Sequence, residues 1–524
     1  MNASIRLIAV LLAVSACSAG LASDLRNDER ALHVLNRLGY GPKPGDIEAV
    51  SRLGVERYIN LQLHPESIPL PDSLSARLSS LPAIGMSAGE ALSQFQTAQK
   101  MAKAAAASGD TAGKEMRRDT AQRMAGQTAE ARLIRAIDSP RQLEEVMVDF
   151  WFNHFNVFSG KGLDRALVAS YERDAIRPFA LGHFRDLLGA TAKHPAMLFY
   201  LDNWISVAPG IEGDPRRAVP AALKVSGLNE NYAREVMELH TLGVDGGYSQ
   251  KDVTELARML TGWTFLPREM LRTGDTFLFD PRRHDNGDKE WLGHRVPASG
   301  RNEGEYALDV LAEHPATARH ISFQLAQYFV SDKPSPDLVN RLAKRFSETH
   351  GDIRAVLGTL FASPEFWNRS AIGTKFKTPY QYVVSSVRAA NMTVTNVRPL
   401  LGTLAQLGMP LYGCQTPDGY KNTEQAWLNP DALTRRINFA TVLASGRLPL
   451  AKPDDADTDA GAMTDANRAE RADRDRWMMS PVDAVQLLTT LGSNLSTSTR
   501  DAVLGAQPAL RSALVLGSPD FMHH

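Results

Sequence analysis

Residues 229–263, NENYAREVMELHTLGVDGGYSQKDVTELARMLTGW, decide the fold class of this chain. Ser249 is a typical helix cap, and Asp252 stands in the capping-box position three residues later. Apolar residues then recur at helical spacing until Gly262, a residue type that commonly ends helices. That apolar stripe comprises Val253, Leu256, Ala257 and Leu260. The stretch therefore predicts a helix from Ser249 to Gly262, preceded by another over Asn229–Gly243.

The same helical spacing dominates the rest of the chain, and no strand–helix alternation suggests a parallel sheet. A long alanine-rich segment at about residues 91–137 is typical of a helical arm. Phe277–Val296 differs, because two short apolar runs flank Asn286-Gly287, a dipeptide of hairpin turns. The predicted fold is an all-α, multi-helix globular body with one small β-hairpin and a long Ala-rich helical arm.

Composition places the chain among ordinary globular proteins. Its 524 residues are 43% hydrophobic and 22% charged, with a formal net charge of −1. This near-zero charge argues against a nucleic-acid-binding protein. No apolar run beyond the N-terminus is long enough to span a bilayer, so no transmembrane span is expected. We divide the chain into a main helical domain, residues 24–450, a polar linker or loop, 451–477, and a C-terminal helical segment, 478–524.

The N-terminus has the features of an export signal. Arg6 precedes the short apolar run Leu7–Val14, and small residues follow. Cleavage after Ala22 would release residues 1–22 and leave a soluble exported protein. Alternatively, the lipobox-like string that ends at Cys17 would make this cysteine a lipid anchor. Both routes predict a protein of the bacterial envelope, in the periplasm, on the outer membrane or secreted.

Cys414 is the second of only two cysteines. The count excludes cysteine-based zinc sites, and the mature chain cannot form an internal disulfide if Cys17 is removed or lipidated. Cys414 is interpreted as a small buried hydrophobic residue.

Several longer strings identify a family. They are FWFNHFNV (150–157), HPAMLFYLDN (194–203), the stretch quoted above, FDPRRHDNGDKEWLG (279–293), GDIRAVLGTLFASPEFW (351–367) and KFKTPYQYVVSSVRAA (375–390). Together they resemble the bacterial family catalogued as domain of unknown function 1800. The resemblance implies a mainly helical exported protein, with a second exported protein encoded nearby as a partner. It carries no established activity.

The Asn229–Gly243 helix concentrates polar residues on one side. Asn231, Glu235 and Glu238 lie at i, i+4 and i+7, whereas His240 falls among apolar neighbours on the other side. An HExxH-type zinc site is therefore excluded. Three interpretations stay open: a solvated face, a buried structural network, and a cleft whose carboxylates bind a hard cation or transfer protons.

Histidines from outside this helix would complete a metal site. His154 lies among aromatic residues, which favours a hydrogen-bonded core histidine over a ligand. His284 lies in the densest charged loop, where Arg283 and Lys289 could hold an anionic substrate group or simply face water. The metal-site hypothesis combines Glu235, Glu238, His154 and His284 around a divalent ion.

We predict an envelope enzyme with hydrolase-like, metal-assisted chemistry. Glu235, Glu238 and His284 would be catalytic, and Asn231, Arg283 and Lys289 would bind substrate. The competing interpretation is a non-enzymatic envelope protein that binds or assembles with a partner through its helical arm.

Overall fold

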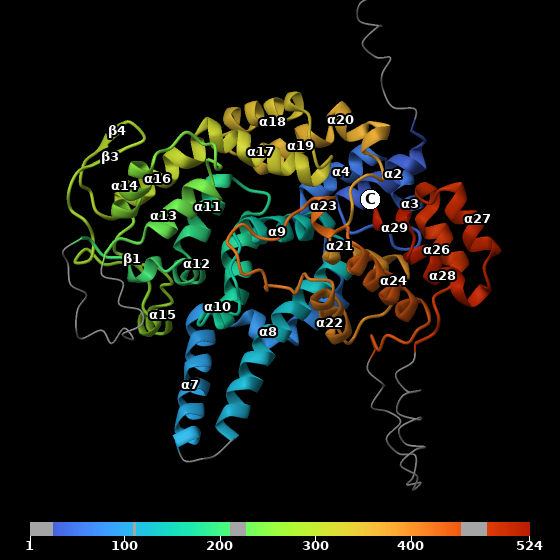
Figure 1. The fold of residues 1–524 in the computed structure, drawn as a ribbon, viewed down its shortest axis with the longest axis horizontal. Helices are drawn as coiled ribbons and strands as arrows, with labels where there is room; N and C mark the ends of the chain where they lie inside the picture. Colours follow the sequence, from blue (N-terminus) through green and yellow to red (C-terminus); the bar gives the residue numbers. More distant parts are fainter. Residues whose placement is uncertain (1–24, 108–111, 210–226, 452–478) are drawn as a thin grey trace, which may run out of the picture.

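A computed structural model describes residues 25–107, 112–209, 227–451 and 479–524 (Figure 1). The predicted signal segment, residues 1–22, lies outside these ranges. So does the predicted linker, 451–477, apart from residue 451.

Helices build the body, and the predicted all-α class is confirmed. The first half contains α2 (Asn27–Arg37), α3 (Asp46–Leu53), α4 (Val55–Leu63), α5 (Asp72–Ser79), α6 (Pro82–Gly85), α7 (Ala88–Ala107), α8 (Ala112–Asp138), α9 (Gln142–His154), α10 (Asp164–Ser170), the π-helix η2 (Tyr171–Ile176), α11 (Phe184–Lys193), α12 (Pro195–Tyr200), α13 (Glu230–Glu238) and α14 (Gln250–Met259). The second half contains α15 (Pro267–Thr273), α16 (Arg301–Glu313), α17 (Pro315–Phe329), α18 (Pro336–Glu348), α19 (Ile353–Phe361), α20 (Pro364–Trp367), α21 (Pro379–Ala389), α22 (Arg398–Gln406), α23 (Glu424–Trp427), α24 (Pro430–Ala444), α26 (Ala484–Leu491), α27 (Thr497–Gly505), α28 (Pro508–Leu516) and α29 (Pro519–Met522). Short 3₁₀ turns at Pro65–Ser67, Arg177–Phe179, Asn203–Ile205, Arg369–Ala371 and Gly492–Asn494 complete the helical elements.

Helix α9 runs through the core, and its neighbours hold it by charge as well as by packing. Arg132 of α8 pairs with Asp149 of α9 at 2.5 Å and with Glu172 of the π-helix at 3.2 Å. The Tyr412 hydroxyl donates to the same Glu172 at 2.8 Å. Because all four side chains are buried or nearly so, each charge depends on these partners.

The predicted alanine-rich arm is the antiparallel pair α7 and α8, which projects from the body (Figure 1). Its base packs against α6, α10 and α15. Small side chains such as Ala91, Ala98 and Ala102 are buried between the helices, which explains the alanine-rich composition.

The β-hairpin predicted in Phe277–Val296 exists, but its turn was misplaced. β3 (Lys289–Trp291) pairs with β4 (His294–Val296) across Leu292 and Gly293, whose φ angles are 47° and 77°. Two central residues with positive φ make the tight turn that suits a hairpin twist. Gly287 instead donates its amide to Asp285 Oδ1 at 2.9 Å, so Asn286-Gly287 belongs to the preceding loop.

The apolar run before that loop pairs elsewhere. β2 (Leu278–Phe279) forms a second two-stranded sheet with β1 (Trp263–Thr264), which follows α14. The close approach explains Gly262, which has φ +81° and lies so near Asp280 that an added Cβ would be 2.6 Å from its carbonyl oxygen.

The last residues return to the body. The amide of Lys377 donates to Met522 O at 2.9 Å, and the amide of His524 donates to Lys375 O at 2.9 Å. In the described part of the chain, no helix combines the length and apolar character that a membrane span requires.

Candidate active site

Helix α13 presents the carboxylates that the sequence analysis singled out. Asn229 caps it, because its side chain accepts from the amides of Asn231 at 3.0 Å and Tyr232 at 3.3 Å. The core-facing side is buried and comprises Tyr232, Ala233, Val236 and Met237. Glu235 and Glu238 are only partly exposed, and Asn231 is exposed. The expected polar and apolar sides are therefore present, and the two carboxylates lie at the boundary with the protein interior.

Glu235 has an altered proton affinity. Burial raises its pKa to about 7, the charge of Glu238 acts in the same direction, and Arg234 opposes both. The charge of Asp418 adds a further, smaller increase. The Tyr248 hydroxyl donates to Glu238 Oε2 at 2.9 Å. A carboxyl group with a pKa near neutrality next to a second carboxylate suits general acid–base chemistry.

Asp418 reaches the site on a loop that α9 holds in place; we call residues 412–420 the Asp418 loop. Asn153 donates to Tyr420 O at 2.9 Å and accepts from the Tyr420 amide at 2.7 Å. Asn156 donates to Thr416 O at 2.8 Å, and the Tyr200 hydroxyl donates to Gln415 O at 2.8 Å. Asn153 in the last turn of α9 and Asn156 just beyond the helix thus fix a loop more than 250 residues later in the chain.

Asp418, Tyr248 and Tyr200 are site residues that no sequence pattern predicted. The signals were weak: Asp418 belongs to an Asp-Gly turn dipeptide, and Tyr248 follows Glu238 by ten residues. Sequence spacing alone does not identify the loop that Asn153 and Asn156 bind.

His284 is enclosed by other partners. Its Nδ1 lies 2.9 Å from Thr261 O, and its Nε2 lies 3.1 Å from Glu303 Oε1. Lys289 Nζ lies 2.5 Å from the other Glu303 oxygen. The side chains of all three ionisable residues are fully buried. Burial opposes ionisation of Glu303, but hydrogen bonds from His284 and Lys289 hold its pKa below the usual value.

Arg283 also contacts the protein, because its Nη2 donates to Ser206 O at 3.2 Å. His284, Lys289 and Arg283 thus lie against α14, α16 and the Ser206 segment, whereas Glu235 and Glu238 face Tyr248 and the Asp418 loop. The contacts of the two groups run to different parts of the protein.

His154 is a buried histidine of the core. Its Nε2 lies 3.1 Å from His240 O, and its ring lies 6.2 Å from the His240 ring and 6.3 Å from the His320 ring. Burial lowers its pKa well below the usual value, and the two histidines add to this. Among the residues described, no three His, Cys, Asp or Glu side chains are placed to hold a metal ion. The predicted set Glu235, Glu238, His154 and His284 is not assembled.

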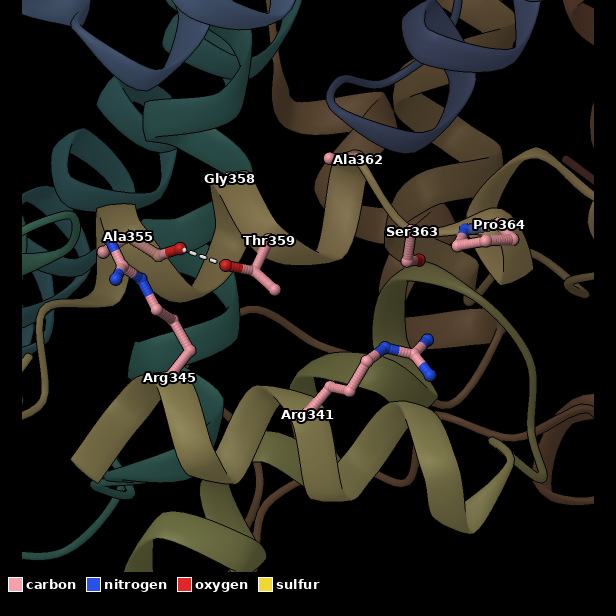
Figure 2. A pocket seen from close by; sticks show the side chains of 8 residues that line it. All are labelled: Arg341, Arg345, Ala355, Gly358, Thr359, Ala362, Ser363 and Pro364. Atoms are coloured by element: carbon pink, nitrogen blue, oxygen red, sulfur yellow. Dashed lines mark hydrogen bonds between the residues drawn. The ribbon is translucent and has the colours of Figure 1, made fainter. Parts of the chain in front are cut away.

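Cys414 is buried and unbridged, as interpreted from the sequence. A cavity of about 620 Å³ lies between α18 and α19, and neither Glu235 nor Glu238 lines it (Figure 2). Small side chains of α19 line one wall, and Arg341 and Arg345 of α18 reach along the other. Arg341 is paired with Glu365 at 2.5 Å. The cavity contains no carboxylate or histidine in its lining, so it offers no acid–base pair.

A family model described as "Protein of unknown function (DUF1800)" matches residues 33–523. No curated protein and no solved structure matches.

Proposed function

We propose a function for this chain, which belongs to the family described as "Protein of unknown function (DUF1800)". It is an envelope hydrolase whose acid–base pair is Glu235 and Glu238. The observation that carries the proposal is the environment of Glu235. A half-buried carboxyl group with a pKa of about 7 is close to half protonated at neutral pH. It can therefore donate a proton in one step and accept one in the next.

The proposed chemistry is a water-dependent bond cleavage. Glu238 accepts a proton from the attacking water, and Glu235 donates its proton to the leaving group. Water oxygen forms the new bond, the leaving group departs with the Glu235 proton, and Glu238 returns its proton to Glu235 through solvent. Tyr248 orients Glu238 through its 2.9 Å hydrogen bond. General acid–base catalysis of this kind contributes roughly 10²–10⁴-fold to a rate.

The test uses the purified mature chain and insoluble envelope material. We expect release of soluble products, and a loss of about 100-fold or more in Glu235→Gln and Glu238→Gln. Glu48→Gln, an exposed glutamate of α3, is the matched control and should retain full activity. Equal release by Glu235→Gln and the unmodified chain, or no release by the unmodified chain, contradicts the proposal.

The same preparation tests the divalent metal ion expected from the sequence. Elemental analysis of the chain and of Glu235→Gln separates metal-assisted cleavage from proton transfer alone. If the unmodified chain contains a stoichiometric metal and Glu235→Gln does not, the mechanism includes metal-assisted cleavage.

Export to the bacterial envelope is part of the proposal. It is supported by Arg6, the apolar run Leu7–Val14 and the small residues after it. Mass spectrometry of the mature N-terminus should find either Ser23 as the first residue or a lipid-modified Cys17. An intact N-terminus on protein recovered from the cytoplasm contradicts export.

The projecting arm favours a second candidate function, that of an envelope assembly partner. Helices α7 and α8 extend beyond the body (Figure 1). Met101 of α7 is half-exposed. The proposed partner is the second exported protein encoded nearby. Met101→Glu should weaken co-purification with that protein and leave product release unchanged. Glu235→Gln should reduce product release and leave co-purification unchanged.

A further inference from the structure

Two buried cations lie where the C-terminal residues return to the body. Lys377 precedes α21, and Arg436 belongs to α24. Lys377 is 4% exposed and Arg436 is 0% exposed. With the rings of Phe376, Tyr382 and Phe521 they form what we call the Lys377–Arg436 cluster.

Both positive charges lie over aromatic rings. The Arg436 guanidinium lies 4.4 Å from the centroid of Phe376 and 4.9 Å from that of Tyr382. Lys377 Nζ lies 3.8 Å from the centroid of Phe521. Ring faces attract cations, but they carry no net negative charge and cannot neutralise them.

The hydrogen-bonding capacity of Arg436 is largely unused. Its Nη2 donates to Lys377 O at 2.7 Å, while its buried Nε and Nη1 have no acceptor among the described residues. Over the same residues, neither cation forms an ion pair. Buried N–H groups without an acceptor cost free energy, and a buried charge without a counter-ion costs more.

Two other buried cations, Lys375 and Arg388, have acceptors for their charge, whereas buried Arg37 leaves its Nε and Nη1 without a partner as Arg436 does. Lys375 lies two residues from Lys377 and is 2% exposed, yet it pairs with Asp332 and donates to Asn422 O at 2.8 Å. Arg388, also buried, donates to two carbonyl oxygens, at 2.9 Å and 2.7 Å. In the Lys377–Arg436 cluster, Arg436 Nε and Nη1 have no acceptor among the described residues.

We propose that the Lys377–Arg436 cluster is a binding site for a small monovalent anion, chloride under physiological conditions, held by Arg436 Nε and Nη1 and by the Lys377 ammonium. A monovalent ion suits the enclosed aromatic surroundings, because a doubly charged oxyanion loses more hydration free energy on burial. The anion supplies the acceptor that Arg436 lacks and separates two like charges. It also links α21, α24 and α29, the elements that carry Tyr382, Arg436 and Phe521.

The experiment is thermal unfolding of the full mature chain in chloride and in methanesulfonate at equal ionic strength. A ligand that binds only the folded state raises Tm as its concentration rises. We expect Tm to increase with the logarithm of chloride concentration and to stay constant in methanesulfonate. Lys377→Met should shift the chloride response to roughly tenfold higher concentration or more, a loss of one charged ligand. Lys375→Met is the matched control and should retain the response.

Crystals soaked in bromide give a direct measurement that needs no variant. An anomalous peak within hydrogen-bonding distance of Arg436 Nε or Nη1 is expected. Equal Tm values in the two salts, or an absent bromide peak, would overturn the proposal and leave buried water as the acceptor. An equal loss of response in Lys375→Met and Lys377→Met would also overturn it.

Discussion

At the scale of single residues, charge in the sequence did not indicate exposure. Lys289 and His284 come from the most charged loop of the chain, yet both side chains are fully buried against Glu303. Asp285 of the same loop is bound by Arg258 through two hydrogen bonds, at 2.9 Å and 3.0 Å. The loop is therefore divided: His284 and Lys289 are buried, whereas Arg282, Asn286 and Asp288 are exposed. The roles predicted for His284, Arg283 and Lys289 stay predictions, and stability measurements can separate them from a structural role.

Lys289→Met should destabilise the protein strongly. Removing one partner leaves the Glu303 carboxylate buried without its counter-ion, which costs about 3–5 kcal/mol. Chemical denaturation of the full chain measures this loss. Lys344→Met, whose side chain is 78% exposed, should change stability little. A cost below about 1 kcal/mol for Lys289→Met would show that water reaches Glu303.

Replacing Glu235, unlike replacing Lys289, should stabilise the protein relative to the unmodified chain as pH rises. Its folded pKa, about 7, lies above the ordinary value of 4.5, so between these pH values the folded state binds the proton more tightly. Its contribution to stability is therefore greatest below pH 4.5 and is lost as pH rises through 7. Between pH 5 and pH 8.5, the unfolding free energy of Glu235→Gln should rise by about 1 kcal/mol relative to that of the unmodified chain, after allowance for solvent screening. Urea unfolding of both proteins at both pH values measures this change. If the difference in unfolding free energy between the two proteins is the same at both pH values, the raised pKa of Glu235 is contradicted.

At the scale of elements, a loop and a helix far apart in sequence build the site together. Asn153 of α9 and Asn156 just after it bond the backbone of the Asp418 loop, and these contacts bring Asp418 to α13. Gly419 permits the close approach, because it has φ +66° and an added Cβ would lie 2.2 Å from Asn153 O. The loop is therefore fixed by a backbone contact that only glycine allows.

Gly419→Ala should detach this loop. The positive φ and the clash with Asn153 together should cost about 2 kcal/mol or more in unfolding free energy. Because Asp418 then moves away, the pKa of Glu235 should also fall. Gly402→Ala is the control, since Gly402 lies within α22 with nothing within 4 Å of an added Cβ. That change should stabilise the chain by about 0.5–1 kcal/mol. Equal effects of the two substitutions would refute the contact.

At the scale of the whole molecule, buried neutral histidines connect stability to pH. Burial lowers the pKa values of His33, His194 and His240 to about 3 in each case. The unfolded chain, with ordinary values near 6.5, binds more protons between these limits. The stability that these groups contribute is thus fully present above pH 6.5 and is lost as pH falls.

The unfolding free energy should therefore fall steeply in mild acid. At pH 5 each of these histidines should cost about 2 kcal/mol relative to pH 7.5. His240→Leu should lose about 2 kcal/mol less than the unmodified chain over that range. Denaturant titrations of both proteins measure the difference, and identical pH dependence would mean that His240 accepts a proton in the folded state.

Local patterns predicted the elements well where the governing forces act over a few residues. The Ser249 capping box, with Asp252, is present in the structure, and the apolar stripe of α14 is buried. The hairpin shows where such reasoning failed. The sequence predicts that Phe277–Phe279 and Glu290–Leu292 pair across Asn286-Gly287, but Phe279 pairs with Trp263 and Glu290 with Arg295. Strand pairing depends on which segments meet in space, so composition alone did not identify the partners.

The amino-acid sequence by itself determined the all-α class, the family, the alanine-rich arm and the two sides of α13, because periodicity, capping and side-chain size act within single helices. Only the tertiary structure decided which polar groups are chemically distinctive. Glu235 acquires its raised pKa from burial and from charges on other segments, while Lys289 and His284 are enclosed with Glu303. Proton affinity follows from hydration and from distances to other charges, and both are set by long-range packing.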